Sequence, residues 1–134
     1  MNEVDSLHVW HRLIKKGDIP AIEAHIKQGA DVNARNQFGW TPLMLAACEG
    51  NTAVVKKLLA EGADVSSIND VGASALCYAA LNGECAVLEV LLEAKAPINV
   101  RPHGASIIEF AKLGIGCCKT QRHFEILNRA GAVG

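Results

Sequence analysis

Hydrophobic and polar positions in this chain follow the period of short amphipathic helices. In the segment about 53–60, apolar side chains recur three and four residues apart, at Val54, Val55, Leu58 and Leu59. Lys56 and Lys57 fall on the opposite side of that helix and are predicted to face water. A second short helix is predicted from about Pro42 to Glu49, and Gly50 is expected to end it.

The ends of the two helices carry residues that suit the backbone geometry there. Thr41 can cap the first helix with its hydroxyl, and Pro42 fits the first helical position, where no N–H is needed. Gly39 can adopt the positive φ of a tight turn, and Gly62 is a candidate C-terminal cap. Together these signals predict a tight turn followed by a helix–turn–helix unit.

This unit recurs with a period of 33 residues. Four glycine-containing pairs begin 33 residues apart, at Gly17-Asp18, Gly50-Asn51, Gly83-Glu84 and Gly116-Cys117. The five residues 29–33 recur at 62–66 and, in a weaker form, at 95–99. A helix pair of this size cannot bury its apolar stripe alone, so stability is expected to come from stacking of successive units.

The repeated residues resemble those of the ankyrin-repeat family. The family's Thr-Pro-Leu start, Ala-Ala pair, helix-ending glycine, Leu-Leu pair and Gly-Ala-Asp-Val tail are present as Thr41-Pro42-Leu43, Ala46-Ala47, Gly50, Leu58-Leu59 and Gly62-Ala63-Asp64-Val65. The resemblance implies an all-α ankyrin-repeat solenoid of four stacked helix-turn-helix repeats with short β-turn tips.

A single ankyrin-repeat domain over 1–134 is expected, with repeats at about 5–35, 36–68, 69–101 and 102–134. The first repeat lacks the Thr-Pro start and has a polar first helix, and the last holds about three extra residues between Cys117 and His123. These two repeats are expected to act as caps.

Charge and composition exclude several classes of function. Lys and Arg number 13 against 14 Asp and Glu, which gives a net charge of -1 and no overall field for nucleic acid or an anionic membrane. No window reaches the ~18 apolar residues of a membrane span, and residues 1–5 are acidic, unlike a secretory signal. The five cysteines lack paired spacing and are expected to be reduced, so a cytoplasmic location is predicted.

No catalytic or cofactor motif is present, and the chain is predicted not to be an enzyme and to need no cofactor. A metal or reactive-thiol site at Cys117, Cys118 and His123, with His103, remains an alternative, but burial explains such cysteines better. His8, His11 and His25 lie in the first repeat, where solvated or capping roles are favoured over metal binding.

Ankyrin-repeat proteins commonly bind partners through residues flanking the turn glycine and through late exposed positions of the first helix. By this resemblance, the candidate partner-binding residues are Arg35, Gln37, Phe38, Trp40, Cys48, Glu49, Ile68, Asp70, Val71, Ala73, Leu81, Asn82, Arg101 and His103. Their charges are mixed, which predicts a partner without extreme charge and argues against DNA or RNA.

Phe38 and Trp40 flank Gly39 at a tip that normally faces water, so both are expected to anchor a partner. In the alternative, Trp40 folds down onto the neighbouring tip and covers it.

Two functions remain open. One is a monomeric module that binds another protein as an inhibitor, immunity-type protein or adaptor. The other is a structural accessory subunit of a larger complex, which charged residues on the second helices disfavour.

Overall fold

The computed structural model describes residues 3–82, 84–98, 126 and 129, and for residues 3–7 it describes the backbone alone. Most of the expected fourth repeat, about 102–134, lies outside these residues. The candidate metal or thiol site at Cys117, Cys118 and His123 lies outside them as well.

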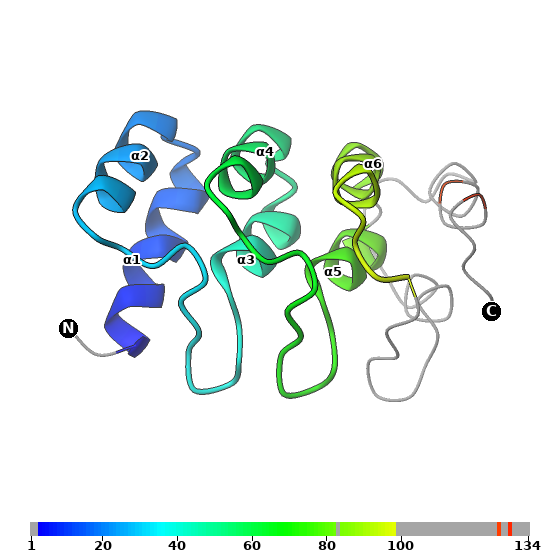
Figure 1. Cartoon of the computed structure of the whole chain (residues 1–134), viewed down its shortest axis with the longest axis horizontal. Helices are drawn as coiled ribbons and strands as arrows, with labels where there is room; N and C mark the ends of the chain where they lie inside the picture. Colours follow the sequence, from blue (N-terminus) through cyan, green and yellow to red (C-terminus); the bar gives the residue numbers. More distant parts are fainter. Residues whose placement is uncertain (1–2, 83, 99–125, 127–128, 130–134) are drawn as a thin grey trace.

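Within the described residues the fold is all-helical, which confirms the predicted class. The elements are α1 (Glu3–Lys16), α2 (Ile19–Lys27), α3 (Pro42–Glu49), α4 (Thr52–Ala60), α5 (Ala75–Asn82) and α6 (Cys85–Glu93). In Figure 1, α2, α4 and α6 form an upper layer above α1, α3 and α5, and the connections 28–41 and 61–74 extend below the helices as two parallel loops. The helix bounds predicted for the second repeat agree with α3 and differ from α4 by one residue.

Small side chains allow the first helices of successive repeats to pack closely. Ala46 and Ala47 on α3 are fully buried, and so are Ala79 and Ala80 on α5. The lower layer therefore packs in chain order, α1 against α3 and α3 against α5. Because alanine side chains add almost no bulk, the backbones of neighbouring helices come close together. Larger apolar residues on either side of the alanines complete the packing.

The helix ends have the predicted capping geometry. The Thr41 hydroxyl accepts a hydrogen bond from the Met44 N–H at 3.3 Å, and Gly50 ends α3 with a φ of 70°. Gly62 has a φ of 95° and directly follows α4 and its C-cap residue, Glu61. Ala63 N–H then donates to the Leu58 carbonyl at 2.9 Å, as is typical of a glycine-terminated helix.

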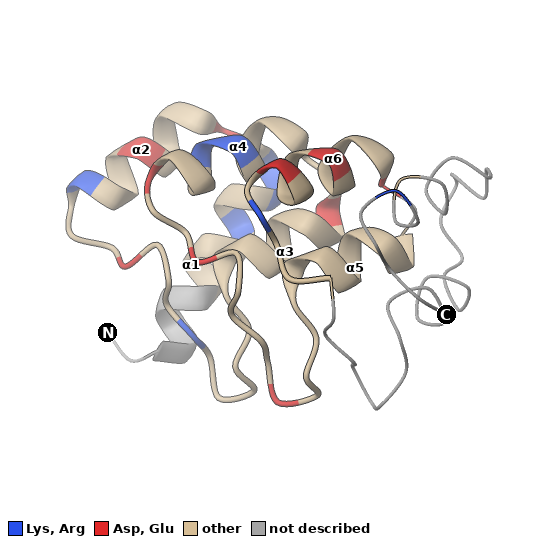
Figure 2. Cartoon of the chain, turned by 45° about the vertical axis from the view of Figure 1, so that its right-hand side comes forward, with Lys and Arg blue, Asp and Glu red and all other residues tan. Residues whose placement is uncertain are grey.

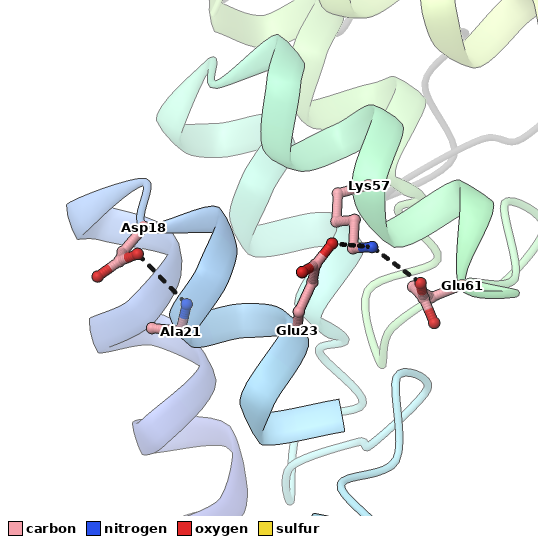
Figure 3. A network of polar contacts seen from close by, with 5 residues as sticks. All are labelled: Asp18, Ala21, Glu23, Lys57 and Glu61. Atoms are coloured by element: carbon pink, nitrogen blue, oxygen red, sulfur yellow. Dashed lines mark hydrogen bonds and ion pairs between the residues drawn. The ribbon is translucent and has the colours of Figure 1, made fainter. Parts of the chain in front are cut away.

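An ion-pair network joins the second helices of the first two repeats. The Lys57 Nζ lies 2.7 Å from Glu23 Oε1 on α2 and 3.0 Å from Glu61 Oε1 (Figure 3). Its hydrogen bond to Lys57 lowers the pKa of Glu23, and the bonds to both carboxylates raise the pKa of Lys57. The prediction that Lys57 simply faces water was therefore wrong, because its side chain is only 20% exposed and bridges two repeats.

Aromatic packing closes the first repeat. Trp10 is fully buried and meets His25 edge-on, with ring centroids 4.9 Å apart. The Trp10 Nε1 and His25 Nε2 atoms are buried, and no described residue forms a hydrogen bond with either. Burial lowers the pKa of His25 because it penalises the charged imidazolium. The His25 ring thus packs against α1 within the first repeat.

We expect Gly39→Ala to destabilise the protein more than Gly29→Ala. Both glycines have positive φ, 82° and 98°, but a Cβ at Gly39 would lie 3.0 Å from the Asn69 Cα, whereas a Cβ at Gly29 would meet nothing within 4 Å. Backbone strain alone should lower the free energy of unfolding by about 1 kcal/mol for Gly29→Ala. The added clash should raise this loss to about 2–3 kcal/mol for Gly39→Ala. Urea unfolding measures both, and equal losses would show that the neighbouring tip moves aside.

Protonation of His25 should weaken the fold. Its folded-state pKa is lower than its unfolded-state pKa, so the unfolded chain binds more protons as pH falls below about 6.5. The contribution of the neutral His25 ring to the free energy of unfolding is complete above that pH and declines below it. We expect His25→Phe to show a smaller loss of unfolding free energy between pH 7.5 and 5.5 than the unsubstituted protein. Parallel pH profiles for the two proteins would contradict this.

Candidate functional site

Each turn tip is organised by one asparagine side chain. Asn36 Oδ1 accepts hydrogen bonds from Phe38 N–H at 2.9 Å and Trp40 N–H at 3.0 Å. In the next repeat, Asn69 Oδ1 accepts from the N–H groups of residues 71 and 73 at 3.2 and 3.1 Å. Neither asparagine was predicted from the sequence, although a signal was present: they are 33 residues apart, and each stands three positions before its turn glycine.

The two tips are also bonded to each other. Asp70 N–H donates to the Phe38 carbonyl at 2.9 Å, and Arg35 Nη2 donates to the Ile68 carbonyl at 2.8 Å. Near the start of the same two connections, Asn33 Nδ2 donates to the Gly62 carbonyl at 3.2 Å. Arg35, predicted to contact a partner, therefore has a structural role between the tips. These bonds hold the two parallel loops of Figure 1 at a fixed separation.

Three large apolar side chains project from these tips. Phe38 is 57% exposed, Ile68 44% and Val71 40%, and they are the exposed large hydrophobic residues of the described part of the chain. All three belong to the predicted partner-binding set, and Phe38 and Val71 hold equivalent positions in successive repeats. We call Phe38, Ile68 and Val71 the turn-tip patch. Apolar groups gathered on one exposed edge are typical of an interaction surface.

Trp40 lies differently from Phe38. It is half-buried, and its ring stacks on Tyr78 of α5 with centroids 4.4 Å apart and a tilt of 30°. The Tyr78 hydroxyl accepts a hydrogen bond from Asn69 Nδ2 at 2.7 Å. The geometry favours the alternative reading, in which Trp40 covers the neighbouring repeat. Ala73, in the turn tip of the third repeat, is fully buried and offers no surface to a partner. Its place in the predicted partner-binding set is therefore corrected.

The late positions of the first helices form the second part of the predicted site. Glu49 is exposed, and its Oε1 lies 3.7 Å from His11 Nε2 on α1. Asn82 is half-buried and its Nδ2 donates to the Cys48 carbonyl at 3.2 Å, which joins the ends of α5 and α3. Leu81 is half-buried beside it. We call the surface formed by the late first-helix positions of the three described repeats, residues 15–16, 48–49 and 81–82, and bordered by the turn tips, the groove.

Cys48 and Cys77 are unsuited to nucleophilic chemistry. Burial, with a smaller contribution from the charge of Glu49, raises the pKa of the half-buried Cys48 to about 12. Cys77 is fully buried, as expected, and burial raises its pKa as well. Both thiols therefore stay protonated near neutral pH, and a protonated thiol is a poor nucleophile and metal ligand.

The remaining predicted residues divide into two groups. Gln37 and Asp70 are exposed on the tips beside the turn-tip patch, whereas Arg101 and His103 lie outside the described residues. In the part of the chain that the structure describes, no group of three His, Cys, Asp or Glu residues could hold a metal ion. Within the same ranges, none of the helices combines the length and apolar content needed to cross a membrane.

Truncation should separate the roles of the two aromatic residues at the tip. Trp40→Ala removes the stacking on Tyr78 and should cost about 2 kcal/mol of unfolding free energy. Phe38→Ala removes an exposed ring and should change stability by no more than about 0.5 kcal/mol. Urea unfolding followed by circular dichroism compares them, and equal effects would mean that the stacking contributes nothing.

Comparison with known proteins agrees with this architecture. A family model for ankyrin repeats, in three copies, matches residues 10–102. The chain is 42% identical over 45 residues to mitochondrial disaggregase of Bos taurus, a match covering 34% of this chain and 7% of that protein. It is 34% identical over 53 residues to protein phosphatase 1 regulatory subunit 27 of Homo sapiens, covering 40% and 34% of the two chains.

A third relative is the ankyrin repeat, SAM and basic leucine zipper domain-containing protein 1 of Loxodonta africana, 35% identical over 51 residues, which are 38% of this chain and 11% of that protein. The matches thus span less than half of each relative's own length. The family model, by contrast, covers more than half of this chain, and the chain belongs to the ankyrin-repeat family.

Proposed function

We propose that this protein binds another protein through the turn-tip patch and the adjacent groove, and acts by occupying its partner. Ankyrin repeats generally mediate protein–protein interaction. The single observation that carries the proposal here is the position of Phe38, Ile68 and Val71, the exposed large hydrophobic residues of the described chain, on two neighbouring tips. Burial of these side chains under a partner would remove apolar surface from water.

The tips are preorganised for binding. The Asn36 and Asn69 side chains fix each turn, and the bond from Asp70 N–H to the Phe38 carbonyl joins the turns. A partner therefore meets a surface whose backbone is already ordered, so little conformational entropy is lost on association. This favours recognition of one defined surface or segment over adaptive binding to many partners.

We propose an inhibitory or adaptor role exerted without catalysis. Cys48, which lines the groove in the described part of the chain, is held protonated by its surroundings. One relative is by name a regulatory subunit of protein phosphatase 1, which supports a regulatory role for a chain of this kind. We further propose that the protein acts in the cytoplasm and is a monomer until it meets its partner.

The opposite side of the stack supports binding through the tips. Figure 2 shows charges of both signs on α2, positive charges on α4 and acidic residues on α6. Lys27, Lys56 and Glu93 are exposed on these second helices, which suits a hydrated surface. For this reason we place the interface on the tips and groove, and we do not propose a subunit enclosed on all sides in a larger complex.

The turn-tip patch can be tested with the double variant Phe38→Ala and Val71→Ala. Both side chains are exposed, so the fold should keep its stability within about 1 kcal/mol. Immobilised unsubstituted protein and variant are each exposed to a native cell extract, and the retained proteins are identified by mass spectrometry. We expect one discrete partner whose affinity, then measured with purified protein, falls about tenfold or more in the variant.

The matched control is Lys56→Ala, which alters an exposed side chain on the opposite side of the stack. It should retain the partner as the unsubstituted protein does. If the double variant also retained the partner at full affinity while remaining folded, the interface would lie outside the turn-tip patch. Trp40 is unsuitable for this test because its loss would disturb the fold.

A further inference from the structure

The groove changes character along the stack. In the 33-residue register, Lys15, Cys48 and Leu81 hold one lining position in successive repeats, and the next position is held by Lys16, Glu49 and Asn82. Both lysines are exposed, whereas Cys48 and Leu81 are half-buried and uncharged near neutral pH. The groove therefore begins with two cations in the first repeat and becomes neutral and partly apolar by the third.

Basic residues continue onto the preceding turn of α1. His11, Arg12, Lys15 and Lys16 are exposed and spaced three and four residues apart, and we call them the α1 basic stripe. Trp10 and Ile14 are fully buried on the opposite side of this helix. The 3.7 Å distance between His11 Nε2 and Glu49 Oε1 places the stripe beside the groove.

Helix stability explains only part of this stripe. Lys15 and Lys16 lie in the last turn of α1, where cations interact favourably with the helix dipole. That effect is lost beyond the last turn, so it does not explain Arg12. The structure records no ion pair for Arg12 among the side chains that it describes, and Glu49 is the recorded acidic neighbour of His11. The stripe therefore carries positive charge that the described side chains leave largely uncompensated.

We propose that the groove binds an acidic segment of the partner protein, with carboxylates over the α1 basic stripe and apolar side chains over Leu81 and the turn-tip patch. The inference rests on the proposed function and adds the chemistry and direction of the bound segment. Complementary charge at one end and apolar contact at the other fix the orientation, because a reversed segment would place carboxylates over Leu81 and Asp70.

An acidic protein segment fits this surface better than nucleic acid does. Within the described ranges, the lysines that line the groove, Lys15 and Lys16, lie at its first-repeat end, and Glu49 and Asp70 are exposed further along. A phosphate backbone carries negative charge along its whole length and would meet both carboxylates. The net charge of -1 supplies no overall attraction that would offset this repulsion.

The test uses a random peptide library displayed on phage and panned on the full chain at low salt. We expect enriched peptides to combine Asp or Glu residues with apolar residues in separate halves. Synthetic copies should bind about tenfold more weakly to the double variant Lys15→Gln and Lys16→Gln. Raising the salt concentration should weaken binding to the unsubstituted protein more than binding to the variant.

The matched control is Lys27→Gln with Lys56→Gln, which removes the same charge from exposed positions on α2 and α4. Lys27 lies in the last turn of α2, so this control also weakens a favourable interaction with a helix dipole. The synthetic peptides should bind this control within about twofold of the unsubstituted protein.

Enriched peptides without acidic residues would overturn the inference, and so would an equal loss of binding in both lysine variants or the absence of any enriched peptide. Tighter binding of a duplex oligonucleotide than of the peptides would also overturn it, in favour of nucleic acid.

The proposed function is tested separately. Apolar peptides that still require Phe38 and Val71 would reject the acidic segment and keep the turn-tip patch, whereas a cellular partner that binds independently of both residues would count against the patch itself.

Discussion

Close packing between the first helices of successive repeats is the interaction on which the rest of this structure depends. It is possible because α3 and α5 bury pairs of alanines, Ala46-Ala47 and Ala79-Ala80, between neighbours. This packing sets the separation of the turn tips, and only at that separation can Asp70 N–H reach the Phe38 carbonyl. The proposed binding surface is thus a product of helix packing at the other end of each repeat.

Polar contacts between repeats supplement this packing with bonds between specific residues. Lys57 joins α4 to a carboxylate on α2, and Asn82 joins the end of α5 to the end of α3. Gly50 contributes as well, because its φ of 70° ends α3 and a Cβ there would displace the end of the Glu84 side chain of the next repeat. Gly50 therefore provides a left-handed backbone and room for its neighbour at once. Each repeat therefore contacts its nearest neighbours along the stack.

The sequence predicted the parts of the fold that local pattern determines and missed those that distant pairs determine. The helix bounds around Thr41 and Gly50 were recovered because caps and period are local signals. The environment of Lys57 was missed because Glu23 is 34 residues away and stands in another repeat. The role of Trp40 stayed open for the same reason, since the stacking partner Tyr78 is in the following repeat. Ala73 was misplaced because a position carried over from a family says nothing about the burial of a small side chain.

The asparagine-organised tips have a consequence for how this chain can change. Asn36 and Gly39 determine the path of the turn, while the side chains of Gln37 and Phe38 are exposed and the turn bonds use only their backbone. Replacement of these two side chains alters the outline presented to a partner and leaves the backbone path as it is. Selection can therefore retune recognition at such positions almost independently of folding, and a new specificity needs no compensating change in the interior.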